Sequence, residues 1–77
     1  MDQAVRYEAQ AEALELTAKA DAAWAAVYFS QGDAELEQSY LGMASTNRST
    51  ARMYRKMAAD SRKAGRKVGY VPAVVIE

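Results

Sequence analysis

The sequence predicts an all-α fold: an antiparallel hairpin of two long helices, followed by an extended C-terminal arm. Three observations lead to this prediction. Alanine occupies 17 of the 77 positions, and no glycine or proline precedes Gly32, so helix propensity is high along the first part of the chain. A single turn signal interrupts the helical pattern near the middle. After Ala64, glycine and proline recur and β-branched residues replace the helix formers.

The first helix is expected over residues 3–30. Asp2 can cap its N-terminus, because a carboxylate accepts the unpaired amide protons of a first turn and complements the helix dipole. The segment from Ser30 to Asp33 is typical of a turn between helices. Gly32 can adopt the left-handed conformation that ends a helix, and Asp33 can cap the next one. An αα-hairpin with a short loop follows.

The second helix is expected over residues 34–64, where Gly65 and then Pro72 break the pattern. We therefore divide the chain into a helical hairpin, 1–64, and an extended arm, 65–77. The arm is rich in β-branched residues and carries no charge between Lys67 and Glu77. It can add to a partner as an edge strand or lie across a neighbouring helix, and disorder is the alternative.

Apolar residues recur at alternating spacings of three and four along both helices, which predicts two facing heptad seams. In the second helix the seam comprises Leu36, Tyr40, Met43, Asn47, Thr50, Tyr54, Met57, Ser61, Ala64 and Val68. In the first helix it comprises Tyr7, Ala11, Leu14, Ala18, Asp21, Ala25 and Tyr28. Asp21 and Asn47 either form a polar layer between the helices, or Asp21 turns outward and Ala22 replaces it.

The first helix also has an apolar side that a two-helix hairpin cannot cover, which predicts a dimer or a higher assembly. The expected interface with a second copy or another protein comprises Val5, Leu16, Trp24 and Val27 from the helix and Tyr70, Val74 and Ile76 from the arm. The large rings of Trp24 and Phe29 can also cap the core beside the turn, and we favour this second arrangement for both.

Charge divides the chain into two parts of opposite sign. Residues 1–43 carry eight acidic and two basic side chains, a net −6, and residues 44–77 carry the reverse, +6. The predicted basic surface comprises Arg48, Arg52, Arg55, Arg62, Lys63 and Arg66. This surface suits solvent or the chain's own acidic helix, an acidic protein partner, or nucleic acid. In an antiparallel hairpin, Glu8, Glu12 and Glu15 lie beside the later part of the second helix, so charge agrees with this packing. That part carries Arg55, Arg62, Lys63 and Arg66.

The chain has no histidine and no cysteine, so imidazole and thiolate catalysis, disulfides and the usual zinc ligands are excluded. We expect no enzyme activity, no cofactor and no bound metal. No apolar run approaches the roughly 20 residues that span a bilayer, and a cytoplasmic location is expected.

The expected function is that of a small non-catalytic protein–protein interaction module: an inhibitor, adaptor or assembly factor. Its partners are a second copy and a larger, acidic-surfaced protein. Alanine and arginine usage is typical of a high-GC bacterium or its phage. The alternatives are a nucleic-acid-binding regulator that uses the basic surface and a structural subunit of a phage particle.

Overall fold

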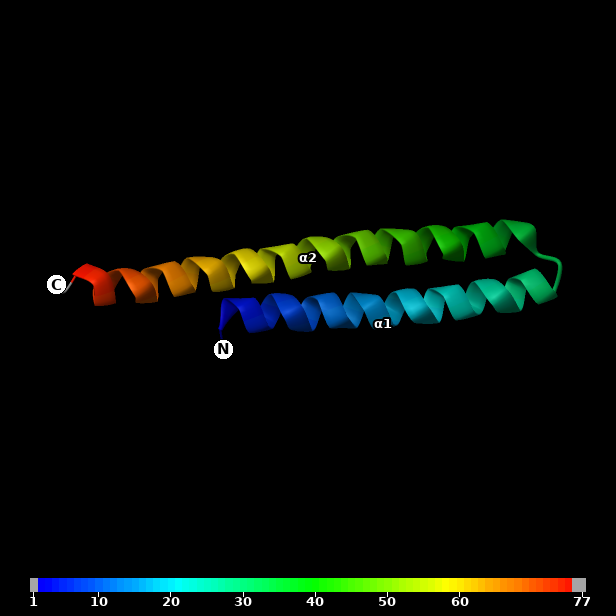
Figure 1. The fold of residues 1–77 in the computed structure, drawn as a ribbon. Helices are drawn as coiled ribbons and strands as arrows, with labels where there is room; N and C mark the ends of the chain where they lie inside the picture. Colours follow the sequence, from blue (N-terminus) through cyan, green and yellow to red (C-terminus); the bar gives the residue numbers. More distant parts are fainter. Residues whose placement is uncertain (1, 76–77) are drawn as a thin grey trace.

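The computed structural model describes the backbone of residues 2–75 and the side chains of residues 2–64, and within this part the chain is helical and contains no strand (Figure 1). Helix α1 spans Gln3–Ser30, and helix α2 spans Ala34–Val75. The two helices pack side by side in opposite directions, and α2 extends past the N-terminus of α1 (Figure 1). The predicted antiparallel hairpin is therefore confirmed.

Helix α1 begins and ends where the sequence predicts. The carboxylate of Asp2 accepts a hydrogen bond from the backbone N–H of Ala4 at 3.2 Å, which satisfies one of the unpaired donors of the first turn. At the other end, Gly32 has a φ of 77°, in the left-handed region. The backbone N–H of Gly32 donates to Phe29, and that of Asp33 donates to Tyr28, the pair of bonds that defines a Schellman motif.

Asp33 also starts α2. Its carboxylate accepts a hydrogen bond from the backbone N–H of Leu36 at 3.1 Å, while its carbonyl accepts from Glu37 at 3.0 Å. Glu35 and Glu37 place negative charge in the first turn of α2, where the helix dipole favours it. The turn is thus fixed by backbone conformation and by a cap that closes one helix and opens the next.

The end of α2 differs from the prediction. The helical backbone continues beyond Ala64, through Gly65 and Pro72, to Val75, whereas the sequence predicted an extended arm from Gly65. Extending an existing helix adds one hydrogen bond for each residue that it orders, and this gain competes with a cost in helix propensity of about 1 kcal/mol for each of Gly65 and Gly69 and about 3 kcal/mol for Pro72. Whether the segment 65–77 docks on a partner stays a prediction.

Alanine alone fills the centre of the contact between the helices. The seven buried apolar residues among the described side chains are spaced by seven along each helix: Ala4, Ala11, Ala18 and Ala25 in α1, and Ala44, Ala51 and Ala58 in α2. Each is 2% exposed or less. A methyl group at every heptad lets the two backbones approach closely, since the distance between helix axes depends on the side chains at the contact.

This arrangement corrects two details of the predicted seams. The fully buried column of α2 lies one residue away from the predicted seam, so Leu36 and Met43 are 39% and 43% exposed instead of buried. The favoured prediction that Trp24 and Phe29 cap the core is also wrong, because they are 52% and 68% exposed. Both errors have one cause: a gap sized for alanine has no room for a large side chain.

The hairpin is long and narrow, with extents of 69 × 17 × 11 Å. Its radius of gyration of 19.0 Å compares with roughly 11 Å for a compact domain of this length. Its accessible surface of 5660 Å² compares with roughly 4,600 Å² expected for a folded monomer of this mass. A two-helix hairpin thus leaves exposed an area that a compact domain would bury.

Candidate functional site

The column of buried alanines separates two flanks of the hairpin that differ in chemistry. On one flank Asn47 donates to Asp21 at 2.9 Å, and the rings of Tyr28 and Tyr40 stack with centroids 5.3 Å apart. On the other flank, Arg55 binds Glu15 through two hydrogen bonds of 2.6 and 2.7 Å. Residues three and four positions after each buried alanine fall on opposite sides of it, which explains the separation.

We call the first flank the tyrosine face. Its residues are large and uncharged apart from Asp21: Tyr7, Leu14, Asp21, Trp24 and Tyr28 from α1, and Leu36, Tyr40, Met43, Asn47, Thr50, Tyr54 and Met57 from α2. Arg6 and Asp60 lie at the outer edge of this face, and the other charged side chains of the paired helices occupy heptad positions at the centre of the contact or on the other side. A broad uncharged face of this kind is typical of a surface that another protein covers.

An aromatic stack crosses the tyrosine face near the turn. Trp24 stacks on Tyr28 with ring centroids 6.1 Å apart, and Tyr28 stacks on Tyr40 of the other helix. Desolvation of the Tyr28 hydroxyl, with a smaller contribution from Tyr40, raises the pKa of Tyr28 above its ordinary value. Leu36 and Met43 belong to the same end of the face. Tryptophan, tyrosine and methionine are enriched in protein interfaces, so this end of the tyrosine face has the composition of a protein-binding surface.

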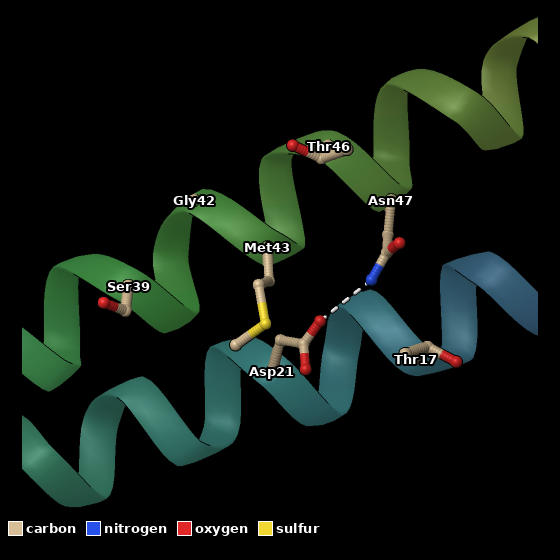
Figure 2. A pocket seen from close by; sticks show the side chains of 7 residues that line it. All are labelled: Thr17, Asp21, Ser39, Gly42, Met43, Thr46 and Asn47. Atoms are coloured by element: carbon tan, nitrogen blue, oxygen red, sulfur yellow. Dashed lines mark hydrogen bonds between the residues drawn. The ribbon is translucent and has the colours of Figure 1, made fainter.

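A polar groove lies beside the aromatic stack, between the two helices. Figure 2 shows the Asp21–Asn47 hydrogen bond within it, with the Met43 side chain reaching towards α1 next to Asp21. The groove is lined by Thr17, Asp21, Ser39, Gly42, Met43, Thr46 and Asn47. The polar layer that the sequence left open is therefore present. Single polar pairs of this kind fix register where helices pack.

We call the second flank the charged face. Its ion pairs are Glu15–Arg55 and Glu8–Arg62, and the paired side chains are between 42% and 49% exposed. The hydrogen bonds from Arg55 lower the pKa of the Glu15 carboxyl, and the same contact raises the pKa of Arg55. Both pairs match the predicted pairing of the acidic first helix with the basic later part of the second helix.

The structure divides the predicted interface residues between the two flanks. Trp24 lies on the tyrosine face, and Val27, 40% exposed, lies at its edge on the outer side of α1. Leu16 lines a depression with Glu15 and Arg55 on the charged face, and Val5 occupies the same flank. These residues therefore do not form one patch. The side chains of Tyr70, Val74, Ile76 and Arg66 lie outside the described residues.

The basic surface is partly used within the hairpin. Arg55 and Arg62 hold carboxylates of α1, and Arg52 donates to the hydroxyl of Ser49 at 3.1 Å. Arg48 and Lys63 are exposed. The internal ion pairs lower the positive charge that this face presents to a partner.

Sequence reasoning did not place Tyr28, Tyr40, Leu36 and Met43 in a candidate interface, because it assigned them to the seam between the helices. One signal could have found them. Alanine recurs at every seventh position, at residues 4, 11, 18 and 25 in α1 and at 44, 51 and 58 in α2. These seven alanines fill the centre of the contact between the helices, so the larger neighbouring side chains lie outside it.

Comparison of the chain with protein-family models, with curated proteins and with solved structures finds no match. Within the described part of the chain, no helix is both long enough and apolar enough to cross a membrane. The same residues contain no group of three or more carboxylates that could hold a metal ion.

Proposed function

We propose that this chain is a non-catalytic protein–protein interaction module that works by covering a surface of its partner with its exposed apolar side chains. One observation carries the proposal. The described side chains that are buried between the helices are all alanine, while Trp24, Met43 and Met53 are between 43% and 54% exposed. A hairpin held together by methyl groups gains little from its own core, so stability and function both favour a bound partner.

The position of the exposed residues supports binding to protein rather than to nucleic acid. Nucleic-acid binders concentrate free basic side chains on one face, because phosphate contacts dominate affinity. Here the carboxylates of Glu15 and Glu8 bind two of the arginines of the charged face. Large apolar side chains are exposed on both faces: Trp24, Leu36 and Met43 on the tyrosine face, and Leu16, Phe29 and Leu41 on the charged face. A role as an inhibitor, an adaptor or an assembly factor is consistent with such a surface.

Two triple variants test the proposal. In the first, Trp24, Leu36 and Met43 of the tyrosine face become serine, and in the matched control, Leu16, Phe29 and Leu41 become serine. We expect the wild-type chain and the control to self-associate or to capture a defined protein from host extract, and the first variant to lose both. A wild-type chain that stays monomeric at high concentration and captures nothing would reject the proposal.

A further inference from the structure

We infer that the tyrosine face binds a second copy of this chain, with the two hairpins antiparallel so that the turn of each lies beside the open end of the other. This inference rests on the proposed function and names its partner. Three properties of the hairpin support it: the area that it leaves exposed, the distribution of charge along its length, and the polar pair at the middle of its face.

The exposed area is large enough to allow a dimer. The accessible surface of the whole chain, with both flanks and the projecting part of α2 included, exceeds that of a compact monomer of the same mass by roughly 1,000 Å². A stable protein interface covers about 800 Å² on each partner. The tyrosine face runs from Tyr7 to Tyr28 on α1 and is continuous across the seam with α2. Two such faces in contact complete a four-helix bundle, in which the side chains that the alanine seam excludes become the core.

Charge selects the orientation of the second copy. The half of the hairpin that contains the turn, residues 20–47, carries Asp21, Asp33, Glu35 and Glu37 and no basic residue, a net −4. The open half, residues 2–19 with 48–64, carries eight basic and five acidic side chains, a net +3. Two parallel hairpins would place like charge beside like charge at both ends. The antiparallel arrangement places the acidic turn of each copy beside the basic end of the other.

Symmetry then fixes which helices meet. A two-fold axis that lies between the faces and crosses the helices at right angles stacks α1 on α1 of the second copy and α2 on α2. Both contacts are antiparallel. The acidic first turn of α2, with Glu35 and Glu37, comes level with the segment of the other α2 that contains Lys56 and Lys63, and these side chains lie outside the contact between the two tyrosine faces.

In the dimer, the contact covers one charged group of each tyrosine face, the carboxylate of Asp21, and this carboxylate already accepts a hydrogen bond within its own hairpin. Asn47 donates to Asp21, and the hydroxyls of Thr17 and Thr46 border the same groove (Figure 2). A covered polar pair near the middle of an apolar face penalises shifted registers, because a shift would bury the pair against apolar side chains. The pair thus favours one alignment of the two copies.

Cross-linking between single-cysteine variants tests the orientation, and the natural chain contains no cysteine that would interfere. Ser39 and Asp60 occupy equivalent heptad positions at the edge of the tyrosine face of α2, and Val27 occupies the equivalent position of α1, near the level of Ser39. With a short bismaleimide, a mixture of S39C and D60C chains should give the mixed dimer, and a mixture of S39C and V27C chains should not. The reverse pattern would overturn the inference. S45C, on the charged face, is the background control.

A matched pair of aromatic variants tests the face itself. Trp24→Ala should weaken the dimer by about tenfold or more, as expected for a large aromatic side chain that an interface buries. Phe29→Ala, which removes a still more exposed ring from the charged face, should leave the dissociation constant within about twofold. Equal effects of the two variants, or a pure chain that is monomeric at every concentration, would contradict the inference. The proposed function would survive either result if the chain captures a different protein, and it would fail with the inference if nothing is captured.

Discussion

At the scale of single residues, the methyl group is the unit that sets the geometry of this hairpin. Ala11, Ala18 and Ala25 face the alanines of α2, and each of the three is 2% exposed or less. Interiors are packed closely enough that one added methylene displaces its neighbours. The separation of the helices, and through it the exposure of every larger side chain, therefore depends on these small residues.

Ala18→Leu should separate the helices and lower the free energy of unfolding by about 1–3 kcal/mol, the usual cost of overpacking. Ala23→Leu is the matched control, because Ala23 is exposed on the outer side of the same helix. Urea unfolding followed by circular dichroism measures both variants. Equal stability of the two leucine variants would show that the alanine column is not the contact between the helices.

The Glu15–Arg55 pair predicts how stability depends on pH. Arg55 lowers the pKa of Glu15 in the folded chain below its ordinary value of 4.5. The pair therefore stabilises the fold above the ordinary pKa, and this contribution disappears as the pH falls through the lowered value. Glu15→Gln should reduce stability near pH 7 and have no effect at low pH. Glu12→Gln, whose carboxylate forms no ion pair among the described side chains, is the control in a pH series of unfolding curves.

The sequence alone predicted the residues that cap the helices and form the turn, but it did not predict which large side chains are exposed. Asp2, Gly32 and Asp33 act locally, so their roles followed from the sequence. The exposure of Trp24 and Phe29 did not follow, because it depends on how closely two distant segments approach. A helical wheel gives the direction of a side chain to within about one residue, and a shift of one residue moves Met43 from the seam to the surface.

At the scale of elements, the turn determines whether the two helices meet in register. Gly32→Ala should destabilise the hairpin by about 1–2 kcal/mol, because a Cβ is disfavoured at a φ of 77° although no neighbouring atom crowds it. Gly42→Ala should stabilise it by about 0.5–1 kcal/mol, because Gly42 lies in open space within α2 and alanine is the better helix former. Opposite signs in thermal unfolding confirm the account, and equal signs contradict it.

The bond between Asp21 and Asn47 predicts coupling between the helices. Asn47→Leu alone should cost more than the double change with Asp21→Leu, because the single change leaves a half-buried carboxylate without its donor. A double-mutant cycle of unfolding free energies should give a coupling of about 1 kcal/mol. Additive effects would mean that the bond does not hold the register of the two helices.

The limits of the elements were predictable where local signals mark them. The bounds of α1 and the start of α2 agree with the sequence because caps and a left-handed glycine define them. The end of α2 at Val75 was not predictable from Gly65 and Pro72, since helix propagation competes with both breakers. The antiparallel ion pairs were predictable because the sign of charge changes once along the chain.

At the scale of the whole molecule, the central claim is that the alanine seam leaves a large uncharged face that another molecule covers. The opposite face satisfies part of its charge internally, through Glu15–Arg55 and Glu8–Arg62. We propose that the chain associates through the tyrosine face. Its narrow shape, 17 × 11 Å in section, makes that face a large share of the total surface.

The most direct measurement uses Trp24, the only tryptophan of the chain, which is 52% exposed in the isolated hairpin. As the concentration of pure protein rises, its fluorescence should shift to shorter wavelength and become protected from acrylamide. The change should coincide with a rise in sedimentation mass from 8.4 kDa to twice that value. Two results would contradict the account. The mass could double while the emission of Trp24 stays at the wavelength of an exposed indole, or the mass could fail to rise at any concentration.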